Sequence, residues 1–308
     1  MGPYFSIPCF FKANNDIDYG ALENYCSHLI SYDSIDTLYT MAYNTRFRQL
    51  SHDEIFEVNK LVCDIANSNG KRAVIGHPYT LTNKELAAFS RKSKSINPYA
   101  ISVLYPERYY NMNEPILDFL STPVQEGLNI MIHEMKLVSG FNGQLINWPE
   151  SLLKEALSLD GVVAIKEDSK NDGITELVNR LCNEKGIEVI VAGGGKVRLR
   201  KLVKEIELRN WLNGSLMLFP YLSDKAIPAY LNGDDEYMDL YEKIVEQPFF
   251  EGVVSKFGWH LAHKAGLAAL GYCELNERAP MPKISTEDYN EVKKLILQID
   301  ENAKNLLI

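Results

Sequence analysis

The chain has 308 residues, 46% of them hydrophobic and 24% charged, a composition typical of a globular protein with one large or two ordinary domains. The net charge of −9 and the lack of a basic patch argue against a nucleic-acid partner, and we expect neither a signal peptide nor a membrane span, which needs about 18 consecutive apolar residues. Because the five cysteines are scattered and suggest neither a disulfide framework nor a metal-ligand pair, we expect a reducing, cytoplasmic setting.

Short apolar runs alternate with amphipathic stretches along residues 1–222. The apolar runs predict eight strands, at residues 4–11, 35–42, 72–76, 99–105, 129–133, 161–166, 187–192 and 214–219. The amphipathic stretches predict a helix after each strand. Ser51 with Glu54 has the spacing of a capping box, and Thr82 with Glu85 repeats it, which marks two of the helix starts.

This alternation predicts the fold. Strands that alternate with helices form a parallel sheet, and eight such units indicate a closed (β/α)8 barrel, the TIM barrel. The alternative, an open doubly wound sheet, requires a glycine fingerprint after the first strand, which residues 8–12 lack. Residues 223–308 show only helical patterns, with Gly271 as a helix stop. We therefore expect a barrel over residues 1–222 and, over residues 223–308, the last barrel helix and a helical extension packed on the barrel as one structural unit.

The sixth predicted strand ends at Lys166. Active sites of such barrels lie at the carboxyl ends of the strands, and Lys166 shares its strand face with Ala164 and Val162, so it is expected to point into the barrel. Burial lowers the pKa of a lysine and lets its amine attack a carbonyl to form a Schiff base. The competing interpretation is a lysine that caps a core strand and extends to solvent.

Residues that end the other strands are expected to share this pocket. They include Phe10, Phe11, His77, Tyr105, His133, Gly193 to Gly195 and Phe219 to Tyr221. The set offers one lysine, two histidines and tyrosines, but no cluster of three metal ligands. We therefore predict imine chemistry on a small carbonyl substrate, with no metal and no other cofactor.

Several segments resemble the dihydrodipicolinate synthase / N-acetylneuraminate lyase family of class I aldolases. Residues 163–169 resemble its G-I-K-D-S-S motif, which carries the Schiff-base lysine, and residues 50–54 resemble its L-S-x-x-E segment. Further similarity covers residues 73–76, 83–87, 264–271 and 278–285. The resemblance implies a barrel with three extra helices, a homo-oligomer (tetramer or dimer), and Lys166 as the Schiff-base residue of a lyase or synthase.

The chain departs from this family at three places, one of which is Val138 in place of an arginine that is a carboxylate ligand in some members. Ala42-Tyr43-Asn44-Thr45-Arg46 replaces the family's G-T/S-T-G-E loop, which binds the carboxylate of pyruvate. His133 stands where the family has its catalytic tyrosine. We predict that His133 shuttles protons, since an imidazole suits that task near neutral pH, and that Tyr43 and Tyr105 assist it. Asn44, Thr45 and the turn formed by Gly193, Gly194 and Gly195 are predicted to orient substrate oxygens.

Other interpretations remain open at the level of sequence. The protein can be a relative that binds a small ligand without pyruvate chemistry, or a lyase that acts on a sugar without a carboxylate. Residues 192–196 suggest either a phosphate cradle or, with more weight, a tight turn. Glu167 and Asp168 suggest a glycosidase pair, which we reject because adjacent strand residues point to opposite faces.

Overall fold

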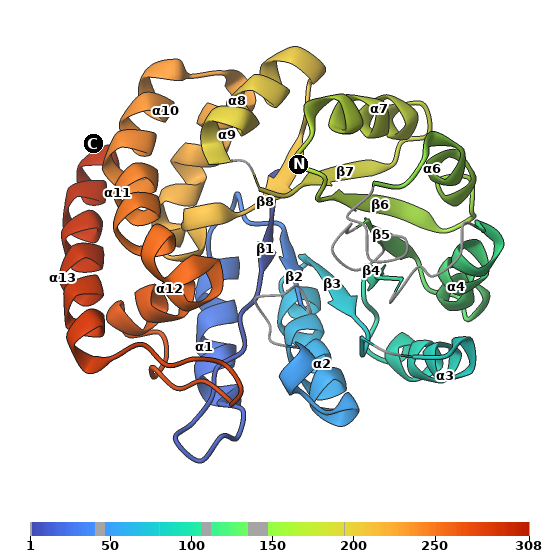
Figure 1. Ribbon diagram of the computed structural model, residues 1–308, viewed down its shortest axis with the longest axis horizontal. Coiled ribbons are helices and arrows are strands. Elements are labelled where there is room, and N and C mark those ends of the chain that lie inside the picture. The colour runs from blue at the N-terminus through green and yellow to red at the C-terminus, as the bar shows by residue number, and fades with distance from the viewer. Residues whose placement is uncertain are drawn as a thin grey trace.

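A computed structural model describes residues 2–40, 47–79, 81–105, 112–134, 147–193 and 195–307. Eight strands form a closed parallel barrel in chain order, with β8 paired to β1, and helices surround it (Figure 1). The predicted TIM barrel is confirmed. The strands are β1 (Gly2–Ser6), β2 (Thr37–Tyr39), β3 (Arg72–Gly76), β4 (Ala100–Val103), β5 (Ile130–Glu134), β6 (Val162–Glu167), β7 (Glu188–Val191) and β8 (Asn210–Leu212).

The prediction of the eighth strand at residues 214–219 is wrong. The strand is Asn210–Leu212, and Gly214–Met217 forms a 3-10 turn. A short apolar run fits a strand and a buried helical turn equally well, and Gly214, with φ of 60°, bends the chain out of the extended conformation. The apolar run therefore indicates a buried segment, but its pattern does not tell a strand from a helical turn.

The first strand is also shorter than predicted, so two aromatic residues do not end it as expected. β1 ends at Ser6, so Phe10 and Phe11 follow the strand rather than end it. Together with Phe219, they pack in the large hydrophobic cluster formed mainly where the helices cover the strands, and not in the cluster inside the barrel. These rings therefore belong to the core and do not end β1 or β8, and their contact with a substrate stays a prediction.

The helices around and beside the barrel follow the predicted order. They are α1 (Tyr19–Ile30), α2 (His52–Ser68), α3 (Asn83–Lys94), α4 (Glu114–Gln125), α6 (Glu150–Ala156), α7 (Asp172–Asn183), α8 (Gly195–Ile206), α9 (Ser223–Asn232), α10 (Asp235–Tyr241), α11 (Gln247–Phe249), α12 (Ser255–Ala269) and α13 (Thr286–Ala303). Ser51 with Glu54, and Thr82 with Glu85, form the two predicted capping boxes. Side-chain caps thus fix the starts of α2 and α3.

Alternate strand residues fill the barrel interior. Its central cluster consists of Tyr4, Tyr39, Val74, Ala100, Met131, Ala164 and Ile190. At the amino-terminal end, the guanidinium of Arg72 lies 2.6 Å from Glu188, which also accepts hydrogen bonds from Tyr4 and Tyr99. Polar side chains therefore close one end of the barrel, and the other end carries Lys166.

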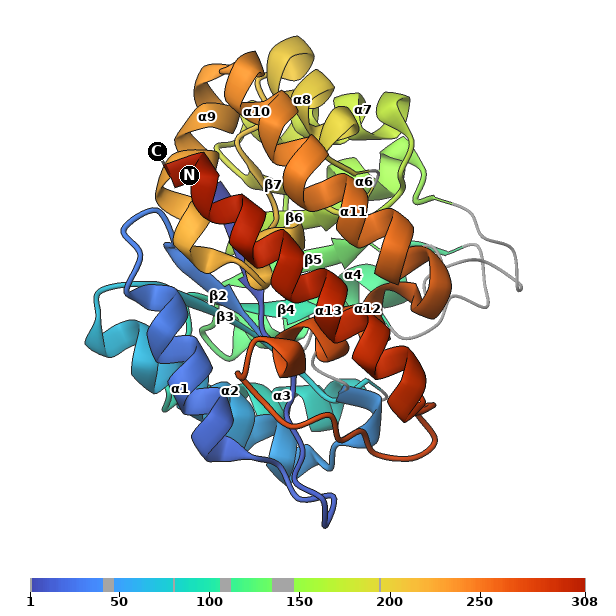
Figure 2. The same cartoon turned by 90° about the vertical axis from the view of Figure 1, so that its left-hand side faces the viewer.

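The C-terminal helices lie beside the barrel, and α13 packs against α12 along the outside of the molecule (Figure 2). α12 ends at Ala269, and Gly271 follows with φ of 84°, as expected for a helix stop. Arg278 then pairs with Glu54 at 2.6 Å, which ties this segment to the start of α2. No helix within the described ranges is long and apolar enough to cross a membrane. The division of the chain at residue 222 stays a prediction.

Candidate active site

Lys166 and His133 meet at the carboxyl end of the barrel, on the neighbouring strands β6 and β5. The strand register pairs the two residues directly, and alternation along each strand points both side chains into the barrel. Nζ of Lys166 lies 2.7 Å from Nε2 of His133, and neither residue is more than 4% exposed. The structure therefore brings two predicted catalytic residues within hydrogen-bonding distance.

A third ionisable group, Asp168, joins this pair. Its Oδ2 atom lies 3.4 Å from Nζ of Lys166 and 4.0 Å from Nε2 of His133. Asp168 follows Lys166 by two residues, which places both on one side of the extended backbone. The side chain of Asp168 is 16% exposed, against 5% for that of Lys166. The carboxylate thus lies nearer the solvent than the amine that it contacts.

Burial and charge set the protonation states of these three groups. Burial lowers the pKa of Lys166, and the Asp168 carboxylate partly opposes that shift. Burial, together with the charge of Lys166, lowers the pKa of His133 to about 4, so its imidazole is neutral near pH 7. Burial acts to raise the pKa of Asp168, but the charge of Lys166 and the nearby imidazole of His133 outweigh it and lower that pKa to about 2. The lysine therefore contacts a neutral base and an anion.

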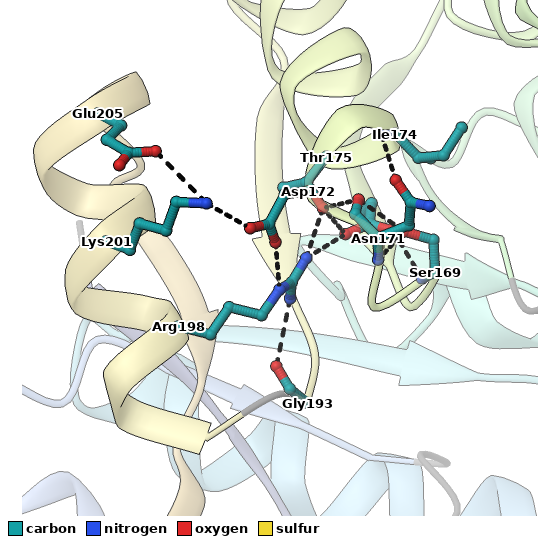
Figure 3. A network of polar contacts seen from close by, with 10 residues as sticks. Ser169, Asn171, Asp172, Ile174, Thr175, Gly193, Arg198, Lys201 and Glu205 are labelled. Carbon is teal, nitrogen blue, oxygen red and sulfur yellow. Dashed lines mark hydrogen bonds and ion pairs between the residues drawn. The ribbon is translucent and has the colours of Figure 1, made fainter.

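A network of polar contacts links the segment between β6 and α7 to α8 (Figure 3). Glu167 points away from the barrel interior and is buried, and its carboxylate accepts hydrogen bonds of 2.6 Å from the Ser169 N–H and from the Thr175 hydroxyl. Arg198 of α8 donates to the Thr175 hydroxyl at 2.7 Å and to Asp172 at 2.8 Å. These contacts hold the segment between β6 and α7, and with it the position of Asp168.

His77 and Tyr105 lie at the ends of β3 and β4. Nδ1 of His77 donates to the Pro78 carbonyl at 2.6 Å, and Nε2 accepts from the Leu104 N–H at 3.2 Å. Burial lowers the pKa of His77 to about 4, so a neutral ring links the two strand ends. Tyr105 packs edge to face against Phe119 of α4, with ring centroids 5.6 Å apart. The assisting role predicted for Tyr105 stays a prediction.

Several predicted residues fall on segments that the structure does not describe. Tyr43, Asn44, Thr45 and Gly194 lie outside the described residues. Gly193 and Gly195 lie at the start of α8, with φ of 77° and 72°, and the Gly193 carbonyl accepts a hydrogen bond from Arg198 at 3.3 Å. The predicted turn includes Gly194, so the predicted contact of this segment with substrate oxygens stays a prediction.

Sequence reasoning missed Asp168 as a site residue. Glu167 and Asp168 do point to opposite sides, as the rejection of a glycosidase pair assumed. The same alternation, extended one residue beyond the strand, places Asp168 beside Lys166. The signal was therefore present in the spacing, although strand β6 itself ends at Glu167.

Comparison with protein-family models finds no match, and none is found among curated proteins. Solved structures do match, over nearly their full lengths. The 4-hydroxy-tetrahydrodipicolinate synthase from Methylacidiphilum fumariolicum SolV has a TM-score of 0.80 at 18% identity, covering 99% of this chain and 97% of that one. The N-acetylneuraminate lyase from Fusobacterium nucleatum has a TM-score of 0.81 at 16% identity, covering 96% and 97%.

These matches confirm the predicted resemblance at the level of the fold. A dihydrodipicolinate synthase from Bacteroides thetaiotaomicron gives the same result, with a TM-score of 0.80, 17% identity and coverage of 96% and 97%. A fold can carry many activities, so the chemistry must be argued from the side chains of the site. The chain thus has the barrel fold, with its C-terminal helices, that dihydrodipicolinate synthases and N-acetylneuraminate lyases share.

Proposed function

We propose that this protein is a Schiff-base-forming lyase or synthase of the class I aldolase type. Its substrate is a 2-oxo acid such as pyruvate, or a related keto or sugar compound, which forms an imine on Lys166. The observation that carries the proposal is the buried amine of Lys166, 2.7 Å from the imidazole of His133 at the catalytic end of the barrel. The lysine itself supplies the electron sink, so the reaction requires no cofactor.

The first step is activation of the lysine. His133 has a lowered pKa of about 4 and is therefore an unprotonated base near neutral pH. Its Nε2 atom accepts a proton from the Lys166 ammonium, and the free amine then attacks the carbonyl carbon to give a carbinolamine. Return of that proton to the carbinolamine hydroxyl releases water and leaves a protonated imine.

The protonated imine then promotes the change at the adjacent carbon. When a C–C or C–H bond to that carbon breaks, its electron pair moves toward the iminium nitrogen and forms an enamine. The reverse movement makes the bond, so one set of residues serves both directions. Tyr43 and Tyr105 assist proton transfer in this proposal. Asn44, Thr45 and the turn at Gly193, Gly194 and Gly195 hold the substrate oxygens.

One observation favours a second candidate, a relative that binds a small ligand without turning it over. Asp168 lies 3.4 Å from Nζ of Lys166, and an anion at that distance favours the ammonium, which is not a nucleophile. In this alternative the lysine holds an oxygen of the ligand by a charge-assisted hydrogen bond. The two candidates differ in whether Nζ of Lys166 forms a covalent bond with the ligand.

Borohydride trapping with intact-protein mass spectrometry separates the candidates. The protein is incubated with pyruvate, other 2-oxo acids and keto sugars, and the imine is reduced to a stable amine. We expect an adduct on the wild type and none on Lys166→Ala. His133→Gln keeps a hydrogen-bonding group but no base, so we expect its adduct to form about 10² to 10⁴ times more slowly. No adduct with any carbonyl, at unchanged folding, supports the non-catalytic candidate.

A homo-oligomer, either a dimer or a tetramer, also belongs to this proposal. It rests on the family resemblance in the sequence, and sedimentation of the purified protein measures it. Monomers at working concentration contradict it without affecting the proposed chemistry.

A further inference from the structure

Asp168 places a fixed negative charge beside the atom that would form the imine. The Oδ2–Nζ distance to Lys166 is 3.4 Å, and the lowered pKa of Asp168, about 2, keeps the carboxyl ionised near pH 7. The motif that residues 163–169 resemble has serine at this position. The charge is therefore a feature of this chain.

Hydrogen bonds on both sides of Asp168 hold its backbone next to Lys166. The Glu167 carboxylate accepts from the Ser169 N–H and from Thr175 of α7, and Arg198 donates to the Thr175 hydroxyl. Asp168 therefore keeps its place two residues beyond Lys166, and a substrate bound as the imine lies beside its carboxylate.

Whether a substrate fits beside the Asp168 carboxylate depends on the group bonded to its carbonyl carbon. In a 2-oxo acid that group is a carboxylate, bonded to the carbon that joins Nζ of Lys166. Two carboxylates then lie within a few ångströms of each other in a largely buried site, where like charges repel strongly. A hydroxyl at the same place instead donates a charge-assisted hydrogen bond to Asp168. Among the other described cations, Lys170 acts electrostatically on both Lys166 and Asp168, but its side chain is exposed, so solvent screens it.

We propose that Asp168 makes this site selective for a neutral carbonyl substrate with a hydroxyl on the adjacent carbon, an α-hydroxy ketone or α-hydroxy aldehyde of the keto-sugar type, over a 2-oxo acid. The inference rests on the proposed imine at Lys166 and narrows its substrate class. Asp168 acts here by contact with the substrate hydroxyl, and Lys166 and His133 keep the roles given above.

The test uses two ketones of nearly equal size. Pyruvate carries a carboxylate next to its carbonyl, and hydroxyacetone carries a hydroxymethyl group there. The initial rate of borohydride-trapped adduct formation is measured for each ketone on the wild type, Asp168→Ser and Asp168→Asn, with Lys166→Ala as the background. The ratio of the two rates is compared between variants, so that changes in the reactivity of the Lys166 amine cancel. Circular dichroism and thermal unfolding verify that each variant is folded.

We expect the wild type to form the hydroxyacetone adduct faster, and both Asp168 variants to raise the pyruvate-to-hydroxyacetone ratio by about tenfold or more. Asp168→Asn keeps the shape of the side chain and removes its charge, so an effect shared by both variants belongs to the charge. A ratio that stays within about twofold of the wild-type value, with adducts formed, overturns the selectivity and leaves the imine intact. Absence of adducts from wild type and both variants overturns the imine itself, and the selectivity with it.

Discussion

At the scale of single residues, burial keeps two histidines neutral, but their ring nitrogens have different partners. Burial lowers the pKa of His77, and both of its ring nitrogens serve backbone groups, one donating and one accepting. Burial and the charge of Lys166 lower the pKa of His133. The first ring therefore has a structural place between two strand ends, and only the second has a nitrogen that contacts the proposed nucleophile.

These two histidines predict acid sensitivity. Each has a pKa lowered from 6.5 to about 4 in the folded protein. Between these values the unfolded chain binds protons that the folded protein does not, so the free energy of unfolding falls as the pH falls from about 6.5 to 4. The contribution of each histidine to the free energy of unfolding is on the order of 3 kcal/mol, and it is fully present above pH 6.5.

Thermal unfolding of the wild type and His133→Gln across this pH range measures the effect. We expect the stability of the wild type, relative to that of His133→Gln, to be higher at neutral pH than at pH 4. A constant difference between pH 4 and 7 contradicts a neutral, buried His133.

At the scale of elements, the turn between β6 and α7 connects the core of the fold to the site. Thr175 of α7 both donates to Glu167 and accepts from Arg198. Thr175→Val keeps the shape of the side chain and leaves a buried carboxylate with one donor fewer. We expect a loss of about 1–3 kcal/mol in stability, together with slower adduct formation on folded protein, because Asp168 and Lys166 are no longer held in place.

Ser121→Val is a matched control for that substitution. The Ser121 hydroxyl donates to the Asp118 carbonyl on α4, at a partly exposed position outside the network around Asp168. We expect little change in either stability or adduct formation. Equal effects of Thr175→Val and Ser121→Val on adduct formation contradict the positioning role of the turn.

The features predicted correctly from sequence are those that a few neighbouring residues decide by themselves. Ser51 and Thr82 mark helix starts because capping is decided within four residues. Lys166 and His133 were placed on the inner face of the barrel correctly, because successive residues of a strand point to opposite faces. The eighth strand was misplaced because residues 214–219 are apolar without being extended. Asp168 was missed because the alternation was not extended beyond the end of the strand, and its approach to His133 depends in addition on strand register, which no single segment encodes.

At the scale of the whole molecule, the two ends of the barrel have different tasks. Arg72 and Glu188 close the amino-terminal end, and the proposed chemistry lies at the other. Barrels of this type separate stability from catalysis in this manner. We therefore expect substitutions at the amino-terminal end to change stability without changing adduct formation at the carboxyl end.

Arg72→Met tests that separation. The substitution removes the cation from Glu188, whose pKa Arg72 helps to lower against the effect of burial. We expect a loss of about 1–3 kcal/mol, less than for a fully buried pair because both side chains are about a quarter exposed. Adduct formation per folded molecule should stay within about twofold of the wild type. A large fall in adduct formation, with the variant folded, contradicts the independence of the two ends.

Peptide mapping of the borohydride-reduced protein decides whether Lys166 forms the imine. The trapped protein is digested, and tandem mass spectrometry locates the added mass. We expect the mass on Lys166 for every carbonyl that labels the wild type, and none on Lys166→Ala. An adduct located on another lysine, or labelling that persists at the same rate in Lys166→Ala, contradicts this role of Lys166.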